Sequence, residues 1–227
     1  MKIKVIFTAA LMSLILIVYA NLSKNNALQA KSNETFSDIK HNAAQSLHSD
    51  MRKLWEDHVT WTRNVIFCII DDLAGTDEAV ARLLKNQDEI GDAIKPYYGE
   101  DAGKKLTGLL RTHITQAADL LKAAKKDDNV AFEQINKKWK GNADEIAEFL
   151  SKANPNWKLL DMKKLMQDHL SLTIEEATAR KKKDFAGDVV AYDKVHNEIL
   201  EMSDMLSEGI VKQFPDKFKM NKQVGMK

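Results

Sequence analysis

Apolar residues recur along most of the chain at intervals of three and four. Between residues 106 and 121, leucine, isoleucine and alanine positions follow the i, i+3, i+4, i+7 spacing of a buried helix face. No stretch alternates apolar and polar residues over the length of a strand. The pattern therefore predicts an all-α protein.

The helical stretches repeat with a period of 55–56 residues. The segment "NQDEIGDAI" starts at residue 86 and its counterpart "NADEIAEFL" at residue 142. Three histidines and three prolines show a similar repeat, and each proline follows a long helical pattern that we expect it to stop: His58, His113 and His169; Pro96, Pro155 and Pro215. We predict an antiparallel helical bundle of about six helices, built from three helical hairpins at approximately 47–95, 100–154 and 157–214.

The N-terminus has the layout of an export signal. Lys2 and Lys4 precede an apolar run, 5–20, that ends in the small residue Ala20. This run is shorter than the roughly 20 apolar residues that usually span a membrane, so an uncleaved membrane anchor is the alternative and not the first interpretation. We predict a signal peptide at 1–20, with cleavage after Ala30 as a second alternative, and therefore an exported protein, periplasmic or extracellular.

Composition indicates how the remaining residues are organised. Residues 21–45 are rich in Asn, Ser, Lys and Ala without a sustained apolar stripe, which predicts a flexible tether. We expect a single helical-bundle domain at 46–218 and a disordered tail at 219–227.

The charge balance limits the classes of partner. The chain has 34 basic and 33 acidic residues, so nothing favours nucleic acid, and we expect membrane contact only through the N-terminal segment. The remaining candidates are a small ligand and a protein of the cell envelope.

The repeated histidines lie inside apolar stripes, about 11 to 13 residues from the expected start of each hairpin. Parallel helices would bring them to one level at 1.5 Å of rise per residue. Counting down from a turn at Lys183 returns His196 to that level, and the same count places Trp139 opposite His113. We therefore predict a central layer of four histidines and a tryptophan.

Buried imidazoles need partners, because an unsatisfied buried polar group costs roughly 1–3 kcal/mol. Imidazole is a ligand for zinc, copper or iron, so a transition metal is one candidate for this layer, and non-covalent haem is another. The alternatives are a small-molecule cavity and a purely structural polar network. The candidate metal ligands are His58, His113, His169 and His196, and the candidate ligand-binding residues are Trp61, Thr62, Arg63, Asn86, Asn142, Thr173 and Tyr192.

Four segments carry a resemblance to a family of small exported bacterial helical proteins: "WEDHVTWTR", "DEIGDAIKPYYG", "NADEIAEFLSKANPNW" and "GIVKQFP". The resemblance covers about residues 47 to 218 and implies no established activity. The motif residues that carry over are His58, Trp61, Thr62, Arg63, Tyr97, Tyr98, His113, Trp157, His169 and His196. Some members of this family carry automatic names such as glycosyltransferase or acetylglutamate kinase. The residues of this chain do not support those names, because it has no strand–loop–helix unit and no glycine-rich phosphate loop.

Three hypotheses about function follow. The first is an exported, non-enzymatic bundle whose histidine layer binds a metal ion or small ligand, or fixes the packing. The second is a cell-envelope interaction protein in which the histidines are structural. The third is a metal- or haem-dependent redox protein.

Overall fold

The computed structural model describes the backbone of residues 3–218. Residues 1–2 and 219–227, and the side chains of residues 3–21, 27 and 30–42, lie outside the described part of the chain. The predicted tail at 219–227 falls there entirely, and so do the side chains of the predicted signal peptide at 1–20. No helix within the described residues combines the length and the apolar composition needed to cross a membrane.

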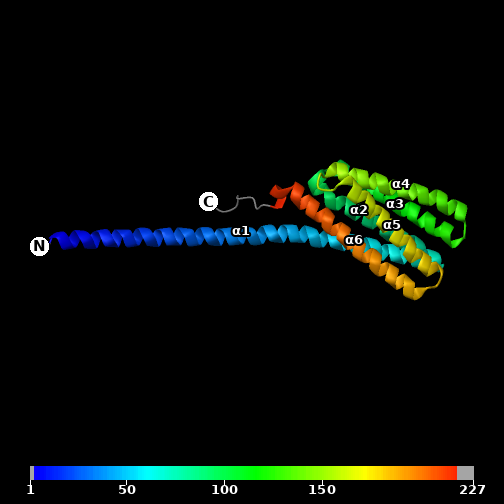
Figure 1. Cartoon of the computed structure of the whole chain (residues 1–227), viewed down its shortest axis with the longest axis horizontal. Helices are drawn as coiled ribbons and strands as arrows, with labels where there is room; N and C mark the ends of the chain where they lie inside the picture. Colours follow the sequence, from blue (N-terminus) through cyan, green and yellow to red (C-terminus); the bar gives the residue numbers. More distant parts are fainter. Residues whose placement is uncertain (1–2, 219–227) are drawn as a thin grey trace. The chain divides into compact units, whose positions relative to one another are not determined.

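Between residues 3 and 218 the chain forms six α-helices and one 3₁₀ helix, and no strand (Figure 1). The prediction of an all-α helical bundle is confirmed. The elements are α1 (Ile3–Ile70), α2 (Thr76–Tyr98), α3 (Glu100–Lys125), α4 (Asn129–Ala153), α5 (Leu159–Lys181), α6 (Phe185–Gln213) and η1 (Pro215–Phe218).

The chain divides into two units, one formed by residues 46–215 and the other by residues 1–45 together with 216–227. The sequence predicted a tether at 21–45 and a first hairpin helix from about residue 47, whereas α1 begins at Ile3. Leu22 and Leu28 in this stretch are exposed, in line with the missing apolar stripe. The backbone is nevertheless helical, because extending an existing helix adds one hydrogen bond per residue while a new helix requires a costly nucleus.

The larger unit consists of three consecutive helical hairpins. Their turns, at residues 71–75, 126–128 and 182–184, lie at the same end of the unit (Figure 1). Each helix from α2 to α5 packs against the next one along the chain. This order makes α1, α3 and α5 run in one direction and α2, α4 and α6 return.

The three turns share one backbone arrangement. A single non-glycine residue adopts the left-handed conformation in each: Asp72 (φ 56°), Asp127 (φ 56°) and Lys183 (φ 61°). The next backbone N–H then donates to the carbonyl oxygen five residues back, in the pairs Leu73–Cys68, Asp128–Ala123 and Asp184–Ala179. This is the hydrogen-bond pattern of a Schellman motif, which satisfies carbonyls at the end of the helix.

Pro96 is a correction to the sequence prediction. It lies inside α2, which continues to Tyr98 and ends at Gly99 with φ 87°. Gly99 stops the helix because glycine adopts a positive φ at little cost, whereas a proline this close to the end removes only one late hydrogen bond. Pro155 and Pro215 do follow the ends of α4 and α6 as predicted.

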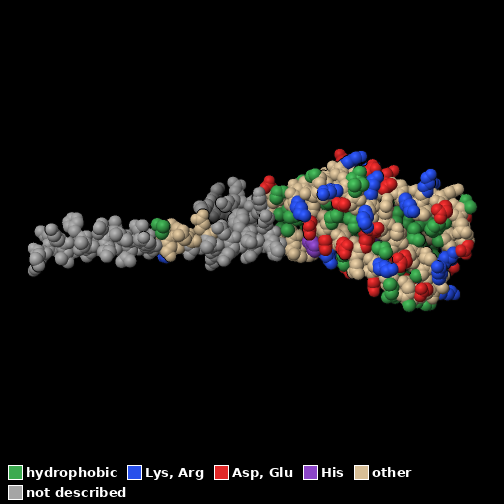
Figure 2. Space-filling view, viewed as in Figure 1, with side chains coloured by type: hydrophobic (Ala, Val, Ile, Leu, Met, Phe, Trp, Pro, Cys, Tyr) green, Lys and Arg blue, Asp and Glu red, His purple; other side chains and the backbone are tan. Residues whose placement is uncertain are grey.

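Apolar side chains fill the unit on both sides of the level of the repeated histidines. Toward the turns they come mainly from α1, α2 and α3, and toward the other end from all six helices. On the face shown in Figure 2, acidic and basic side chains are interspersed, as expected for a chain with nearly equal numbers of each.

Candidate functional site

Three histidines from three different hairpins meet in the centre of the larger unit. The ring centroids of His58 on α1 and His169 on α5 are 5.6 Å apart, and those of His113 on α3 and His169 are 6.4 Å apart. All three residues are buried, with 3–4 % of their surface exposed. The apolar stripe of each helix turns its histidine inward, since the imidazole occupies a stripe position.

Each imidazole is anchored through Nδ1 by the returning helix of its own hairpin. The three distances are 3.2 Å from His58 Nδ1 to Gln87 Nε2, 3.0 Å from His113 Nδ1 to Asn142 Oδ1, and 3.0 Å from His169 Nδ1 to Glu198 Oε2. In every pair the partner follows the histidine by 29 residues. The internal repeat of the sequence therefore includes a repeated hydrogen bond in the core.

The first two hairpins make this anchor in different ways. Asn142 serves two roles, since its Oδ1 faces His113 while its Nδ2 donates to the carbonyl oxygen of Leu109 at 3.1 Å. In the first hairpin, Asn86 donates to the carbonyl oxygen of Leu54, and the adjacent Gln87 faces His58. Both candidate asparagines thus donate a hydrogen bond to a backbone carbonyl oxygen, and Asn142 is the one of the two that is also hydrogen-bonded to a histidine.

Burial favours the neutral form of two of the imidazoles, His58 and His113. It lowers the pKa of His58 well below the ordinary 6.5, and the nearby His169 and His113 lower it further. Burial likewise lowers the pKa of His113 to about 3, although its hydrogen bond to Asn142 raises the pKa. His58 and His113 are therefore uncharged at neutral pH.

His196 is not part of the layer, which corrects the sequence prediction. Its side chain is 27 % exposed, lies 3.2 Å from Glu56 Oε1 and packs on Tyr192. Glu198 occupies the position that faces His169. Counting residues gave the right height along α6, but two residues correspond to about 200° around a helix, so His196 points away from the centre.

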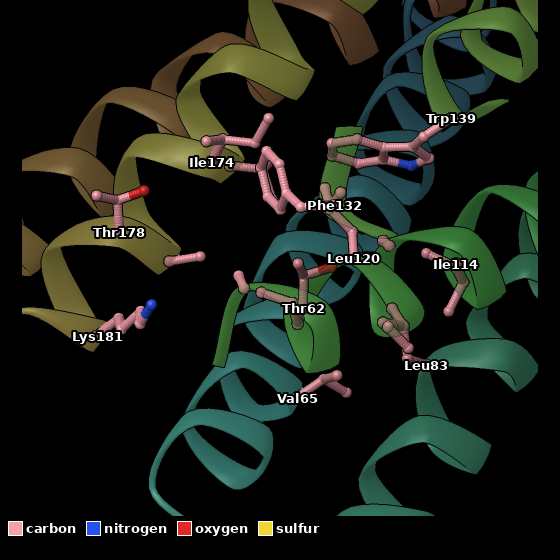
Figure 3. Close-up of a pocket in the computed structure, with 16 residues that line it drawn as sticks. Thr62, Val65, Leu83, Ile114, Leu120, Phe132, Trp139, Ile174, Thr178 and Lys181 are labelled. Carbon is pink, nitrogen blue, oxygen red and sulfur yellow. The ribbon is translucent and has the colours of Figure 1, made fainter. Parts of the chain in front are cut away.

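Trp139 lies against the layer, with its ring centroid 5.1 Å from that of His113. It also lines an apolar pocket between α1, α2, α3, α4 and α5, of about 60 Å³ (Figure 3). Figure 3 places Trp139 at one end of this pocket and Lys181 and Thr178 at the other. Trp139 is 2 % exposed and Thr178 is exposed, so the pocket runs from a surface mouth to a buried end.

Two candidate residues, Thr62 and Thr173, line this pocket one turn beyond His58 and His169. Their hydroxyls donate to the carbonyl oxygens of those histidines at 2.8 and 2.9 Å. The indole Nε1 of Trp139 is buried and has no hydrogen-bond partner. The pocket therefore offers an apolar surface, and one of its lining residues carries an unsatisfied donor.

Arg63 belongs to a separate buried ion-pair cluster. Its Nη1 lies 2.5 Å from Glu176 Oε1 and 2.8 Å from Asp188 Oδ1, and the guanidinium covers the rings of Phe67 and Tyr192. Burial raises the pKa of Glu176 to about 7, although the hydrogen bond and charge of Arg63 lower it. Of the other candidates, Tyr192 contacts this cluster and Trp61 packs under Arg82, both away from the histidine layer.

The sequence prediction missed the layer residues Gln87 and Glu198 and the cluster residues Glu176 and Asp188. Gln87 and Glu198 carry a signal, because each lies 29 residues after a repeated histidine, as Asn142 does. The repeat is hard to recognise in the sequence, because the three partners are three different residue types.

Among the described residues, no group of three or more His, Cys, Asp or Glu side chains is arranged to hold a metal ion. The three clustered imidazoles thus form a polar layer rather than a preformed metal centre. Searches with this chain matched no protein-family model, no curated protein and no solved structure.

Proposed function

We propose that this protein binds a small, uncharged and largely apolar molecule with one hydrogen-bond acceptor, in the pocket beside the histidine layer. The observation that carries the proposal is an apolar pocket lined at its buried end by Trp139, whose buried Nε1 has no hydrogen-bond partner. A buried donor without a partner costs about 1–3 kcal/mol, and a ligand oxygen at this position would recover that free energy.

The lining of the pocket supports an apolar ligand body. Four alanines, at positions 117, 118, 124 and 177, leave space that larger side chains would fill. Close-packed protein interiors contain few voids larger than a water molecule, so about 60 Å³ of space is notable. A single water needs about 10–15 Å³ on such a measure, and a cavity of roughly 150 Å³ accepts benzene. The pocket therefore suits a molecule of a few heavy atoms, such as a short-chain ketone or alcohol.

The surroundings of the pocket also favour an uncharged ligand. Lys181, at the mouth, is already paired with Asp127, and the hydroxyls of Thr62 and Thr173 are used by backbone carbonyls. No free charge in the described lining is left to compensate a buried ion. The predicted N-terminal signal supports the further proposal that the protein acts after export, in the periplasm or outside the cell.

The test is a titration of the ¹⁵N-labelled full-length protein with butanone, followed by NMR of the indole N–H groups. Trp139→Phe assigns the Trp139 resonance. We expect a saturable downfield shift of this resonance and a smaller response to cyclopentane, which lacks an acceptor.

Ala117→Leu fills the pocket and is expected to abolish the response. Ala102→Leu is the matched control, because Ala102 is also half-buried on α3 but lies outside the pocket lining, and it should leave the response intact. A response that survives Ala117→Leu, or an unresponsive Trp139 N–H in folded wild-type protein, would contradict the proposal.

A further inference from the structure

We propose that the Nε2 atoms of His58, His113 and His169 together bind one neutral, water-sized molecule that both donates and accepts hydrogen bonds, and that Gln87 makes the site prefer it to a transition metal ion. None of the three histidines lines the apolar pocket, so this inference goes beyond the proposed function and stands independently of it.

The proton on His113 is located by its partner. Asn142 Nδ2 donates to the carbonyl oxygen of Leu109, so the oxygen of the same amide faces His113 Nδ1. An amide oxygen only accepts hydrogen bonds, and Nδ1 therefore carries the proton. Because the ring is neutral, Nε2 of His113 presents a lone pair.

His58 has the opposite arrangement. The Nε2 of Gln87 lies 2.9 Å from the carbonyl oxygen of Leu83 and 3.0 Å from Asn86 Oδ1, which are both acceptors, so the nitrogen of this amide faces His58. Its two hydrogens are shared among these two oxygens and His58 Nδ1. An amide nitrogen does not accept a hydrogen bond, so His58 Nδ1 must be the unprotonated atom. Neutral His58 therefore carries its proton on Nε2.

His169 adds a third ring nitrogen to the site. Its Nδ1 donates to the Glu198 carboxylate at 3.0 Å. Nε2 is then a lone pair in the neutral ring and a donor in the protonated ring. In both states the site keeps the Nε2–H of His58, which repels a metal cation, and the lone pair of His113, which a simple anion cannot use. A neutral molecule that donates and accepts, such as water, matches both.

The spacing of the rings agrees with this ligand. The hydrogen-bond length from nitrogen to oxygen is about 2.8 Å, and an imidazole nitrogen lies about 1.1 Å from its ring centroid, so two rings sharing one oxygen have centroids about 6 Å apart. Two rings sharing a zinc ion, at about 2.0–2.1 Å per bond, have centroids about 5 Å apart. The observed 6.4 Å between His113 and His169 is close to the first value, and the 5.6 Å between His58 and His169 lies between the two.

Gln87 is the residue that distinguishes this site from a metal site. A metal-binding histidine usually donates its second ring N–H to a carboxylate, a carbonyl oxygen or water. His113 and His169 satisfy that condition through Asn142 and Glu198, and His58 does not. Turning the amide of Gln87 over would place its oxygen against two acceptors, Leu83 O and Asn86 Oδ1, so the orientation is locked.

The first experiment locates the protons in the wild-type protein. Long-range ¹H–¹⁵N spectra of the histidine rings of the untagged, full-length chain should show His58 protonated on Nε2 and His113 on Nδ1. We also expect a nuclear Overhauser contact between the His58 Nε2–H and a bound water. A His58 proton on Nδ1, or no such water contact, would overturn the proposal, and this outcome needs no variant to fold.

The second experiment uses Co²⁺ and Ni²⁺ as probes, measured by titration calorimetry and by the visible bands of bound Co²⁺. Gln87→Glu replaces the donor with an acceptor and lets His58 present a lone pair. We expect wild-type protein to bind neither ion stoichiometrically at the layer, and folded Gln87→Glu to bind Co²⁺ at least tenfold more tightly. His113→Ala in the Gln87→Glu background should remove that gain.

Two outcomes would overturn the role of Gln87. One is stoichiometric binding of Co²⁺ by the wild-type protein that is lost on His113→Ala, and the other is a folded Gln87→Glu variant that binds Co²⁺ no more tightly than wild-type protein. The pocket titration with butanone reports on a different site, so each proposal can fail alone.

Discussion

His113 Nδ1 lies 3.0 Å from Asn142 Oδ1, and these two residues stand 29 positions apart on neighbouring antiparallel helices. The bond fixes which ring nitrogen carries the proton, and burial keeps the imidazole neutral by disfavouring a second proton. The layer therefore couples folding to pH, with a sign that follows from the pKa values.

Acid should destabilise the protein through His58 and His113. Both have lowered pKa values when folded, and that of His113 is about 3, whereas the unfolded values are about 6.5. The unfolded state therefore binds more protons below pH 6.5, and stability falls as the pH drops through that value. Each such histidine costs about 1.4 kcal/mol per pH unit in this range. Urea unfolding at pH 7 and pH 5 measures the loss, and His113→Phe should reduce the dependence.

Glu176 opposes this trend. Its folded pKa of about 7 lies above the value of 4.5 for the unfolded group, so the folded state binds more protons between these values and gains stability as the pH falls. Glu176→Gln removes the opposing contribution and should steepen the loss of stability between pH 6.5 and pH 5. An equal or shallower pH dependence in Glu176→Gln would show that this carboxyl is already ionised in the folded protein at neutral pH.

Arg63 should matter far more to stability than an exposed arginine. Its partners Glu176 and Asp188 are almost fully buried. Arg63→Met leaves Glu176 without its cation and leaves Asp188 with only Arg180, at 3.4 Å, so it should cost about 3–5 kcal/mol. Arg111 pairs with Asp88 on the surface, where both side chains are more than 40 % exposed. Arg111→Met should therefore cost less than about 1 kcal/mol. Chemical denaturation of both variants at pH 7 makes the comparison, and similar losses would be inconsistent with the buried cluster.

Repetition made much of this architecture readable from the sequence. The spacing of His58, His113 and His169 predicts three equivalent hairpins, and Lys183 is the turn residue that the count along the third hairpin requires. Both results depend only on the constant rise of a helix. His196 shows the limit of such counting, because the rise sets the height of a residue and the turn of the helix sets its direction.

The partners of the histidines were harder to find for a chemical reason. Gln87, Asn142 and Glu198 can all reach an imidazole nitrogen, but they differ in length, charge and donor capacity. The ion-pair cluster escaped prediction because Glu176 and Asp188 come from two different helices and approach Arg63 only after packing. Sequence spacing identifies positions on one helix, and it gives no distance between helices.

The close approach of α2 and α3 depends on Gly91. A Cβ atom at Gly91 would lie 2.8 Å from the carbonyl oxygen of Gly103 and would collide with Thr107. Gly91→Ala should therefore destabilise the protein by about 1–3 kcal/mol, despite the better helix propensity of alanine. Gly108, on α3, has open space where a Cβ would be, so Gly108→Ala is the matched control and should stabilise by about 0.5–1 kcal/mol. Thermal and urea unfolding would give opposite signs for the two variants if the helices approach as described.

Lys182 and Lys183 should respond in opposite directions to the same substitution. Lys183 has φ 61°, a left-handed conformation that costs a residue with a Cβ about 1 kcal/mol and costs glycine almost nothing. Lys183→Gly should therefore raise the free energy of unfolding by up to about 1 kcal/mol. Lys182, with φ −75°, is in the ordinary right-handed region, so Lys182→Gly gains nothing in the folded state and makes the unfolded chain more flexible. It should lower stability by about 0.5–1 kcal/mol.

The two variants are matched controls for each other. Both side chains are exposed and both variants lose one positive charge, so the effects of charge and packing on the free energy of unfolding cancel in the comparison. A loss of stability in Lys183→Gly equal to that in Lys182→Gly would mean that the third turn does not close through a left-handed residue as the first two turns do.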